Sequence, residues 1–128
     1  RNARNAAFDA RTEREHWYAV RRQEAENRAR RYLRIAEQDE AYSAAQKAVK
    51  RLDIAIAKAE VFRLPDLEAL RRERLEQCAV RARRLAALHI CEEDLRPAWH
   101  CKKCEDTGFE IDTGRPCGCY SPPKEGDA

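Results

Sequence analysis

The sequence predicts an all-α fold, an elongated three-helix hairpin or bundle, followed by a small cysteine-rich knuckle with short β pieces. Three observations support this prediction. All four glycines of the 128 residues lie from Gly108 onward, and no proline precedes Pro65. Aromatic residues make up only 7% of the chain, so the core is thin. Four of the six cysteines lie between Cys101 and Cys119. The long stretch without glycine excludes a β-sandwich, a Rossmann fold and a loop-rich enzyme.

Composition divides the chain into three parts. Residues 1–96 are expected to form a helical, coiled-coil-like domain, and residues 97–120 a metal-binding module, because Pro97 prevents a helix from running on. Residues 121–128 hold two prolines, a glycine and charges, and read as the start of a linker. Because the chain opens on an arginine and contains no methionine, we expect it to be a piece of a longer protein.

The first helix is expected from about Ala6 to Ile35, rich in alanine, arginine and glutamate. Its apolar stripe approaches a heptad, with Arg22 where the seam expects an apolar side chain. The stripe consists of Tyr18, Ala25, Ala29, Tyr32 and Ala36. Three larger side chains lie off this line and predict a second contact surface: Phe8, Trp17 and Val20.

The run Glu37–Glu40 has no apolar residue and is the expected break, although one continuous helix is an alternative. The second helix has apolar residues in alternating steps of three and four, the spacing of a coiled coil or a small antiparallel hairpin. These residues are Tyr42, Ala45, Val49, Leu52, Ile56 and Ala59. Pro65 and Asp66 then predict the start of a third helix that runs to about His89. Its expected buried stripe is Leu67, Leu70, Leu75, Cys78, Ala82 and Leu85.

The cysteines of the C-terminal module have the spacing of metal ligands. A Cys101-x-x-Cys104 pair is followed, after twelve residues, by Cys117-Gly118-Cys119. Four thiolates on one Zn²⁺ give a closed tetrahedral site, which is structural because no position is left for water. A site that uses His100 or Cys91 in place of one cysteine is an alternative. Disulfides are a poorer fit, because disulfide scaffolds are short and loop-rich.

Short extended pieces are expected around Phe109–Ile111 and near Cys117, joined by a turn at residues 112–115. Four apolar residues of the module are available to cover the metal site and to dock it on the helices. They are Trp99, Phe109, Ile111 and Tyr120.

Charge and motifs limit the function classes. The net charge of +3 is too small to indicate a nucleic-acid partner, and four thiolates on a divalent metal would lower it to +1. The chain contains no catalytic triad order, no metalloprotease motif and no phosphate-binding loop, so we do not expect an enzyme. No apolar run approaches 18 residues and no signal peptide is recognisable, so no membrane association is expected. Free metal-binding cysteines are typical of a reducing compartment, here the cytoplasm.

The C-terminal motif resembles a known family. The segment Trp99–Phe109, with its C-x-x-C-x-D-T-G-F pattern, and the later Cys117-Gly118-Cys119-Tyr120 resemble the N-terminal region of bacterial DnaC/DnaI-type primosomal helicase loaders. Asp94-Leu95-Arg96-Pro97 and the charged helical region upstream also resemble this family, so that the likeness covers roughly residues 30–120.

The resemblance implies an adaptor for DNA replication. In this family the N-terminal region binds the hexameric replicative helicase, and a following AAA+ domain, absent from this chain, binds ATP and contacts single-stranded DNA. The family's metal-binding cysteines correspond to Cys101, Cys104, Cys117 and Cys119. Two other classes stay open: a zinc-ribbon nucleic-acid-binding module on a helical stalk, with Lys102, Lys103 and Arg115 on one face, and a purely structural coiled-coil protein.

Overall fold

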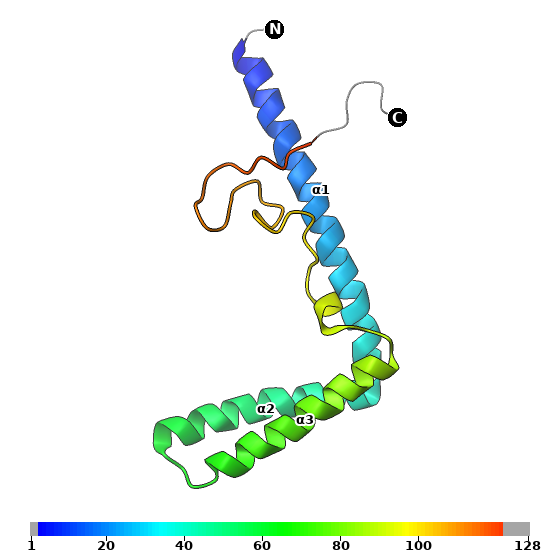
Figure 1. Cartoon of the computed structure of the whole chain (residues 1–128), viewed down its shortest axis with the longest axis vertical. Coiled ribbons are helices and arrows are strands. Elements are labelled where there is room, and N and C mark those ends of the chain that lie inside the picture. Colours follow the sequence, from blue (N-terminus) through cyan, green and yellow to red (C-terminus); the bar gives the residue numbers. More distant parts are fainter. Residues whose placement is uncertain (1–2, 122–128) are drawn as a thin grey trace. The chain divides into compact units, whose positions relative to one another are not determined.

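The fold is described by a computed structural model that covers residues 3–121 (Figure 1). It contains the helices α1 (Ala3–Gln38), α2 (Glu40–Phe62) and α3 (Leu67–Ala87) and a short 3-10 helix, η1 (Glu92–Leu95). The predicted all-α class with three helices is therefore confirmed. Among residues 3–121 no strand forms, and the expected short β pieces are reduced to one isolated antiparallel bridge between Phe109 and Pro116. Apart from Ser121, the predicted linker at 121–128 lies outside the described residues.

The described chain divides into two compact units. One unit, called here the cysteine unit, combines residues 3–29 of α1 with residues 96–121. The other, called here the hairpin unit, consists of residues 30–95. No helix in the part of the chain covered by the structure is long and apolar enough to cross a membrane.

The break between α1 and α2 falls at Asp39, inside the predicted run 37–40. Asp39 has extended backbone angles and is the N-cap of α2, where its carboxylate accepts a 2.9 Å hydrogen bond from the backbone N–H of Tyr42. A side-chain acceptor at this position satisfies a donor that the first turn of a helix leaves without a partner. The two-helix interpretation of this region is confirmed, and the continuous helix is wrong.

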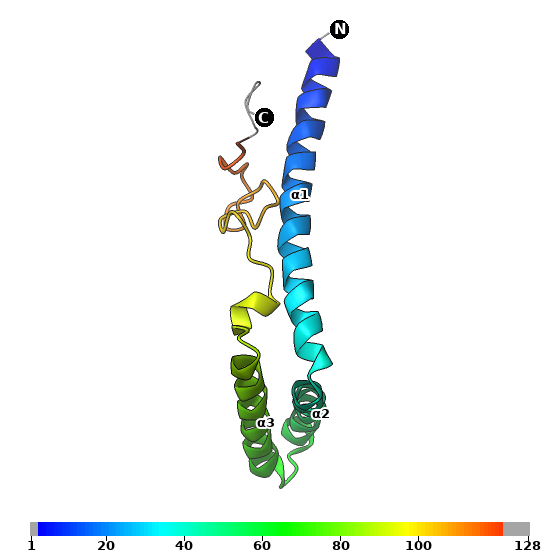
Figure 2. The same ribbon diagram turned by 90° about the vertical axis from the view of Figure 1, so that its right-hand side faces the viewer.

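The hairpin unit is built on α2 and α3, which lie side by side (Figure 2). Five of the six residues predicted for the seam of α2 are buried, and Ile56 is half-buried. At the end where α1 enters, a small core joins the three helices and the segment after α3. Its buried members are Ala36, Tyr42, Leu85 and Ile90.

The predicted stripe of α3 is only partly confirmed. Leu85 is buried and Leu67, Leu70 and Cys78 are half-buried, but Ala82 is exposed and Leu75 is 70% exposed. Ten residues separate Leu75 from Leu85, and at about 100° per residue this turns Leu75 roughly 80° away from the line of Leu85. Leu75 therefore lies off the face that packs on α2.

Arginines of α3 pair with acids across the hairpin. Arg84 donates two hydrogen bonds, of 2.8 and 3.0 Å, to the two carboxylate oxygens of Asp39, and Arg71 lies 3.2 Å from Glu60. The hydrogen bonds from Arg84, together with the one from Tyr42, hold the pKa of Asp39 below its usual range. Asp39 thus caps α2 and also ties α3 to its first turn.

This pairing predicts a pH-dependent contribution to stability. The pKa of Asp39 is lower in the folded chain than in the unfolded chain. The charge of Asp39 therefore stabilises the fold fully at pH values above its pKa in the unfolded chain, and this stabilisation is lost as the pH falls through its pKa in the folded chain. Asp39→Asn keeps a good N-cap but removes the charge. Urea unfolding should show the variant less stable than the parent at neutral pH, with the difference shrinking in strong acid. An equal difference at both pH values would mean that the charge of Asp39 contributes nothing.

The cysteine unit places residues 96–121 along the first part of α1, as both ribbon views show (Figures 1 and 2). The contact face of α1 is the predicted stripe, since Tyr18, Ala25 and Ala29 are buried. Tyr18 forms one buried cluster with Cys104 and Cys117. This half of α1 is therefore one wall of the cysteine site.

Candidate metal centre

The four cysteines predicted as ligands converge on one point. The Sγ atoms of Cys101, Cys104, Cys117 and Cys119 all lie within 4.8 Å of one another. Cys104 and Cys117 are buried, and the other two are half-buried. The residues described by the structure therefore include a four-thiol cluster that can hold a metal ion.

The sulfur spacing matches a tetrahedral metal site. The Sγ atoms of Cys101 and Cys117 lie 3.8 Å apart, and those of Cys104 and Cys119 lie 3.7 Å apart. Four sulfurs at about 2.3 Å from a central Zn²⁺ lie about 3.8 Å from one another. Two independent pairs, each joining the first half of the motif to the second, are thus already at the required separation. All six cysteines are free, so no disulfide competes for these sulfurs.

A buried carboxylate shapes the first half of the site. Asp106 is 1% exposed, and its two oxygens accept 2.9 Å hydrogen bonds from the backbone N–H groups of His100 and Cys101. The chain between Cys104 and Asp106 turns sharply, and both Glu105 and Asp106 have positive φ, at 50° and 57°. Residues other than glycine rarely adopt positive φ unless the surrounding structure holds them there. The hydrogen bonds of Asp106 hold the turn that directs Cys101 and Cys104 inward.

The second half of the site is fixed by backbone hydrogen bonds. The N–H of Cys117 donates to the carbonyl of Gly108 at 2.8 Å, which ties the second cysteine pair to the end of the first turn. A turn lies at residues 111–113 and overlaps the one predicted at 112–115, and the N–H of Gly114 donates to the carbonyl of Glu110 at 2.7 Å. Gly118 does not have positive φ and has open space around it, so the C-x-C pair reaches the cluster without the freedom of a glycine there.

Helix α1 covers the site with aromatic side chains. The hydroxyl of Tyr18 lies 3.3 Å from the Sγ of Cys119, so it can donate a hydrogen bond to that sulfur when it is a thiolate. Trp17 meets the rings of Tyr18 and Tyr120 edge-on, at centroid distances of 4.9 and 5.2 Å. Arg22 donates a 2.9 Å hydrogen bond to the backbone carbonyl of Asp106. The arginine in the apolar stripe of α1 therefore has a structural role, because it binds the backbone of the cysteine segment.

Without a cation, the four sulfurs differ in acidity. The backbone N–H groups of Cys104 and Lys103 hold the pKa of the Cys101 thiol at about 7. Burial raises the pKa of the Cys119 thiol to about 12, against the lowering effect of the Tyr18 hydroxyl. Burial also raises the pKa of Tyr18. A bound divalent cation would lower the pKa of all four thiols because it stabilises their thiolates. Metal binding would therefore release protons.

The two alternative ligands lie elsewhere. Nδ1 of His100 is 3.2 Å from a carboxylate oxygen of Asp106, and Nε2 is 3.4 Å from a carboxylate oxygen of Glu24 on α1. Cys91 is exposed and belongs to the hairpin unit. The metal-ligand cluster found in residues 3–121 contains only the four predicted cysteines.

Other sequence predictions for the module are corrected or completed by the structure. Tyr120 packs on the cluster, but Phe109 and Ile111 are 57% and 58% exposed and do not cover it. Trp17, predicted as part of a second contact surface, is half-buried against the cluster and provides the cover instead. Sequence reasoning missed the role of Asp106, and the aspartate two residues after the C-x-x-C pair was the available signal.

The close approach of Gly108 to Tyr18 yields a test of the packing. Gly108 has φ +89°, and a Cβ atom there would lie 2.8 Å from the Tyr18 ring. Gly108→Ala should cost about 1–2 kcal/mol for the backbone alone and should also displace Tyr18 from Cys119. Gly114→Ala is the matched control for the backbone, because Gly114 has φ +71° but open space.

Both variants should be compared by chemical unfolding and by the rate at which a chelator removes bound metal. Faster metal loss is expected for Gly108→Ala only. Equal behaviour of the two variants would show that the contact with Tyr18 does not matter.

Comparison with known proteins adds no relative to this description: no protein-family model, no curated protein and no solved structure matches the chain.

Proposed function

We propose that the four cysteines bind one zinc ion as a closed structural site, and that the chain is a helicase-binding adaptor of a DNA replication helicase loader. The sulfur spacing and the all-thiolate ligand set support zinc, since cysteine-only tetrahedral sites favour zinc or iron–sulfur centres. One zinc per chain, measured by mass spectrometry of the purified protein, is the expected result. Finding iron instead of zinc would correct the proposed identity of the metal and leave the four cysteines as its proposed ligands.

One observation carries the adaptor proposal: all three phenylalanines of the chain are exposed. Phe8 on α1 is 61% exposed, Phe62 at the end of α2 is 70% exposed, and Phe109 in the cysteine segment is 57% exposed. The buried clusters contain tyrosine, leucine, isoleucine, alanine and cysteine, and no phenylalanine. We take these exposed aromatic side chains as candidate anchors for a partner protein, because aromatic residues often carry much of the binding energy of an interface.

The partner is proposed from the sequence resemblance. The motif residues that carry the resemblance, Asp106 and Gly108 among them, hold the metal site together, as shown above. The proposal takes this part of the chain to be the scaffold that helicase loaders share, and the exposed side chains on it to be the ones that meet the helicase. Binding would need no ATP, because it depends on surfaces of this chain alone.

The test is the affinity of the intact, zinc-loaded chain for the hexameric replicative helicase of the same organism, without nucleotide. Phe8→Ala and Phe62→Ala are matched variants, because both remove an exposed aromatic side chain, one from each unit. Whichever of the two side chains contacts the helicase, its replacement should weaken binding by more than about 1 kcal/mol and leave the fold intact. No measurable binding by the parent chain would refute the helicase-loader assignment.

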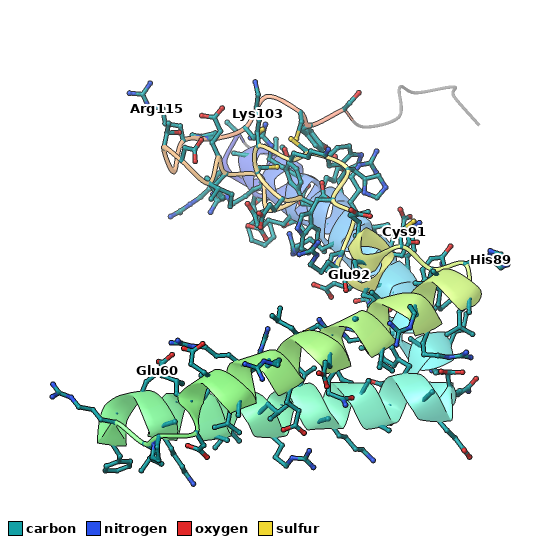
Figure 3. All side chains as sticks on the ribbon, turned by 60° about the horizontal axis from the view of Figure 1, so that its bottom comes forward. Glu60, His89, Cys91, Glu92, Lys103 and Arg115 are labelled. Atoms are coloured by element: carbon teal, nitrogen blue, oxygen red, sulfur yellow. The ribbon has the colours of Figure 1, made fainter. Side chains whose placement is uncertain are left out.

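The nucleic-acid alternative has less support. Lys103 and Arg115 point away from the ribbon of the cysteine segment (Figure 3). Residues 97–121, however, contain three lysines and arginines against four acids, and four thiolates on a divalent ion add two negative charges. Such a segment repels a polyanion. Binding of the chain to single-stranded DNA with a steep salt dependence would favour the alternative.

A further inference from the structure

A groove runs between the first part of α1 and the turn after the first cysteine pair, within the cysteine unit. It has a volume of about 300 Å³ and is separate from the sulfur cluster, none of whose cysteines lines it. Tyr18, Gly108, Phe109 and Pro116 form its apolar lining. The volume is at the lower end of the range for ligand pockets, enough for one large side chain and its neighbours.

The groove is electropositive. Arg11, Arg14 and Arg22 line it from α1, against a single acid, Glu15. Two of these arginines are held in place by contacts inside the unit: Arg14 stacks over the Tyr120 ring at 5.0 Å, and Arg22 donates to the carbonyl of Asp106. Because these two side chains are already held in position, they lose little conformational freedom when they bind an acidic ligand.

Phe109 stands beside this charge with more than half of its surface in solvent. A ligand that fits must therefore offer an apolar group to Phe109 and Tyr18 and negative charge to the arginines. A peptide in which an aromatic or aliphatic residue lies between acidic residues has both properties, and aromatic and arginine side chains are the usual anchors of peptide interfaces.

A nucleic-acid strand fits less well, because it carries a charge at every nucleotide and extends past the groove. The cysteine segment also carries acids outside the groove, at Glu105, Glu110 and Asp112. A short peptide can place its few negative charges beside the three arginines without extending past the groove.

We propose that this groove is a docking site for an acidic peptide segment of a protein partner with a large apolar residue between its acids. The proposal rests on the adaptor function proposed above and assigns the surface that carries it.

The experiment uses the full zinc-loaded chain, labelled with ¹⁵N, and an acetylated synthetic probe of sequence Glu-Asp-Glu-Phe-Asp-Asp-Leu. Saturable shifts of the backbone signals of Tyr18, Gly108 and Phe109 are expected. Control probes replace the phenylalanine with serine, or all acids with lysine, and both should bind at least about fivefold more weakly. An oligothymidylate is tested in parallel.

Two charge-reversal variants locate the site. Arg11→Glu changes the groove at an exposed arginine, and Arg4→Glu makes the same charge change on α1 outside it. The affinity for the probe should fall at least about fivefold for Arg11→Glu and less than about twofold for Arg4→Glu. Equal losses would reduce the effect to net charge and overturn the groove.

The remaining outcomes are distinct. No saturable binding of the probe, or tighter binding of the oligothymidylate, overturns the proposal for the groove. If the helicase binds the parent chain and the Arg11→Glu variant equally well while the probe fails, the adaptor function stands and the groove does not. If the probe binds in the groove and the helicase does not bind, the groove stands and the helicase assignment fails.

Discussion

Removal of the metal is expected to unfold residues 96–121 and to leave α2 and α3 folded. Residues 96–121 contain turns but no strand and no helix, and the buried members of their cluster are Cys104, Cys117 and Tyr18 of α1. In so small a module the free energy of metal binding is the free energy of folding, about 10–16 kcal/mol for structural zinc in small peptides. The hairpin unit has a separate core that contains no ligand.

Cys104→Ser tests this prediction, because Cys104 is fully buried in the cluster. Cys91→Ser is its matched control, since it makes the same change at an exposed cysteine outside the cluster. Cys104→Ser should lose the metal and the hydrogen-exchange protection of residues 96–121, and keep most of the helical circular dichroism. Cys91→Ser should behave as the parent chain. A variant at Cys104 that retains one metal ion and full protection would contradict the four-thiolate site.

Loss of a core leucine should have the second-largest effect. Leu85 is 2% exposed and packs with Ala36, Tyr42 and Ile90, where α1, α2 and α3 meet. Leu85→Ala leaves a cavity in this small core and is expected to destabilise the hairpin unit by about 2–5 kcal/mol. In a unit with so few buried residues, this is a large part of a total stability of about 5–15 kcal/mol.

Leu75→Ala is the control, because it makes the same change on the same helix at a position that is 70% exposed. Its effect on the unfolding free energy should lie within about 0.5 kcal/mol. Both variants are measured by urea unfolding, followed by circular dichroism. A similar cost at the two positions would mean that α3 does not pack as described.

Much of this structure could be predicted from periodicity and spacing. The seam of α2 was predictable because its apolar residues follow one helix face without interruption, and the break at Asp39 because no apolar residue occurs in the run 37–40. The cluster of four cysteines was predictable because two close pairs of cysteines have few alternative uses. Helix α3 was harder: Leu85 is its only buried residue, so a short stripe such as that through Leu75 does not distinguish packed from exposed positions.

Contacts between distant parts of the sequence were not predictable. The hydroxyl of Tyr18 meets Cys119, and Arg22 meets Asp106, across long stretches of chain. Local patterns place these residues on a helix and in a loop but give no information on which loop meets which helix. Phe109 was expected to cover the metal for its apolar character alone, and Trp17, already present on α1, fills that place.

The pairing of α1 with the end of the chain also sets an order for folding during synthesis. The hairpin unit depends on contacts between neighbouring elements, and it is complete once residue 95 has left the ribosome. The apolar face around Tyr18 emerges far earlier than its partner Cys119, 101 residues further on. At about 5–20 residues per second, that face stays uncovered for roughly 5–20 s. During translation the nascent chain therefore carries an unprotected tyrosine–tryptophan surface, where chaperones have time to bind before the cysteines arrive.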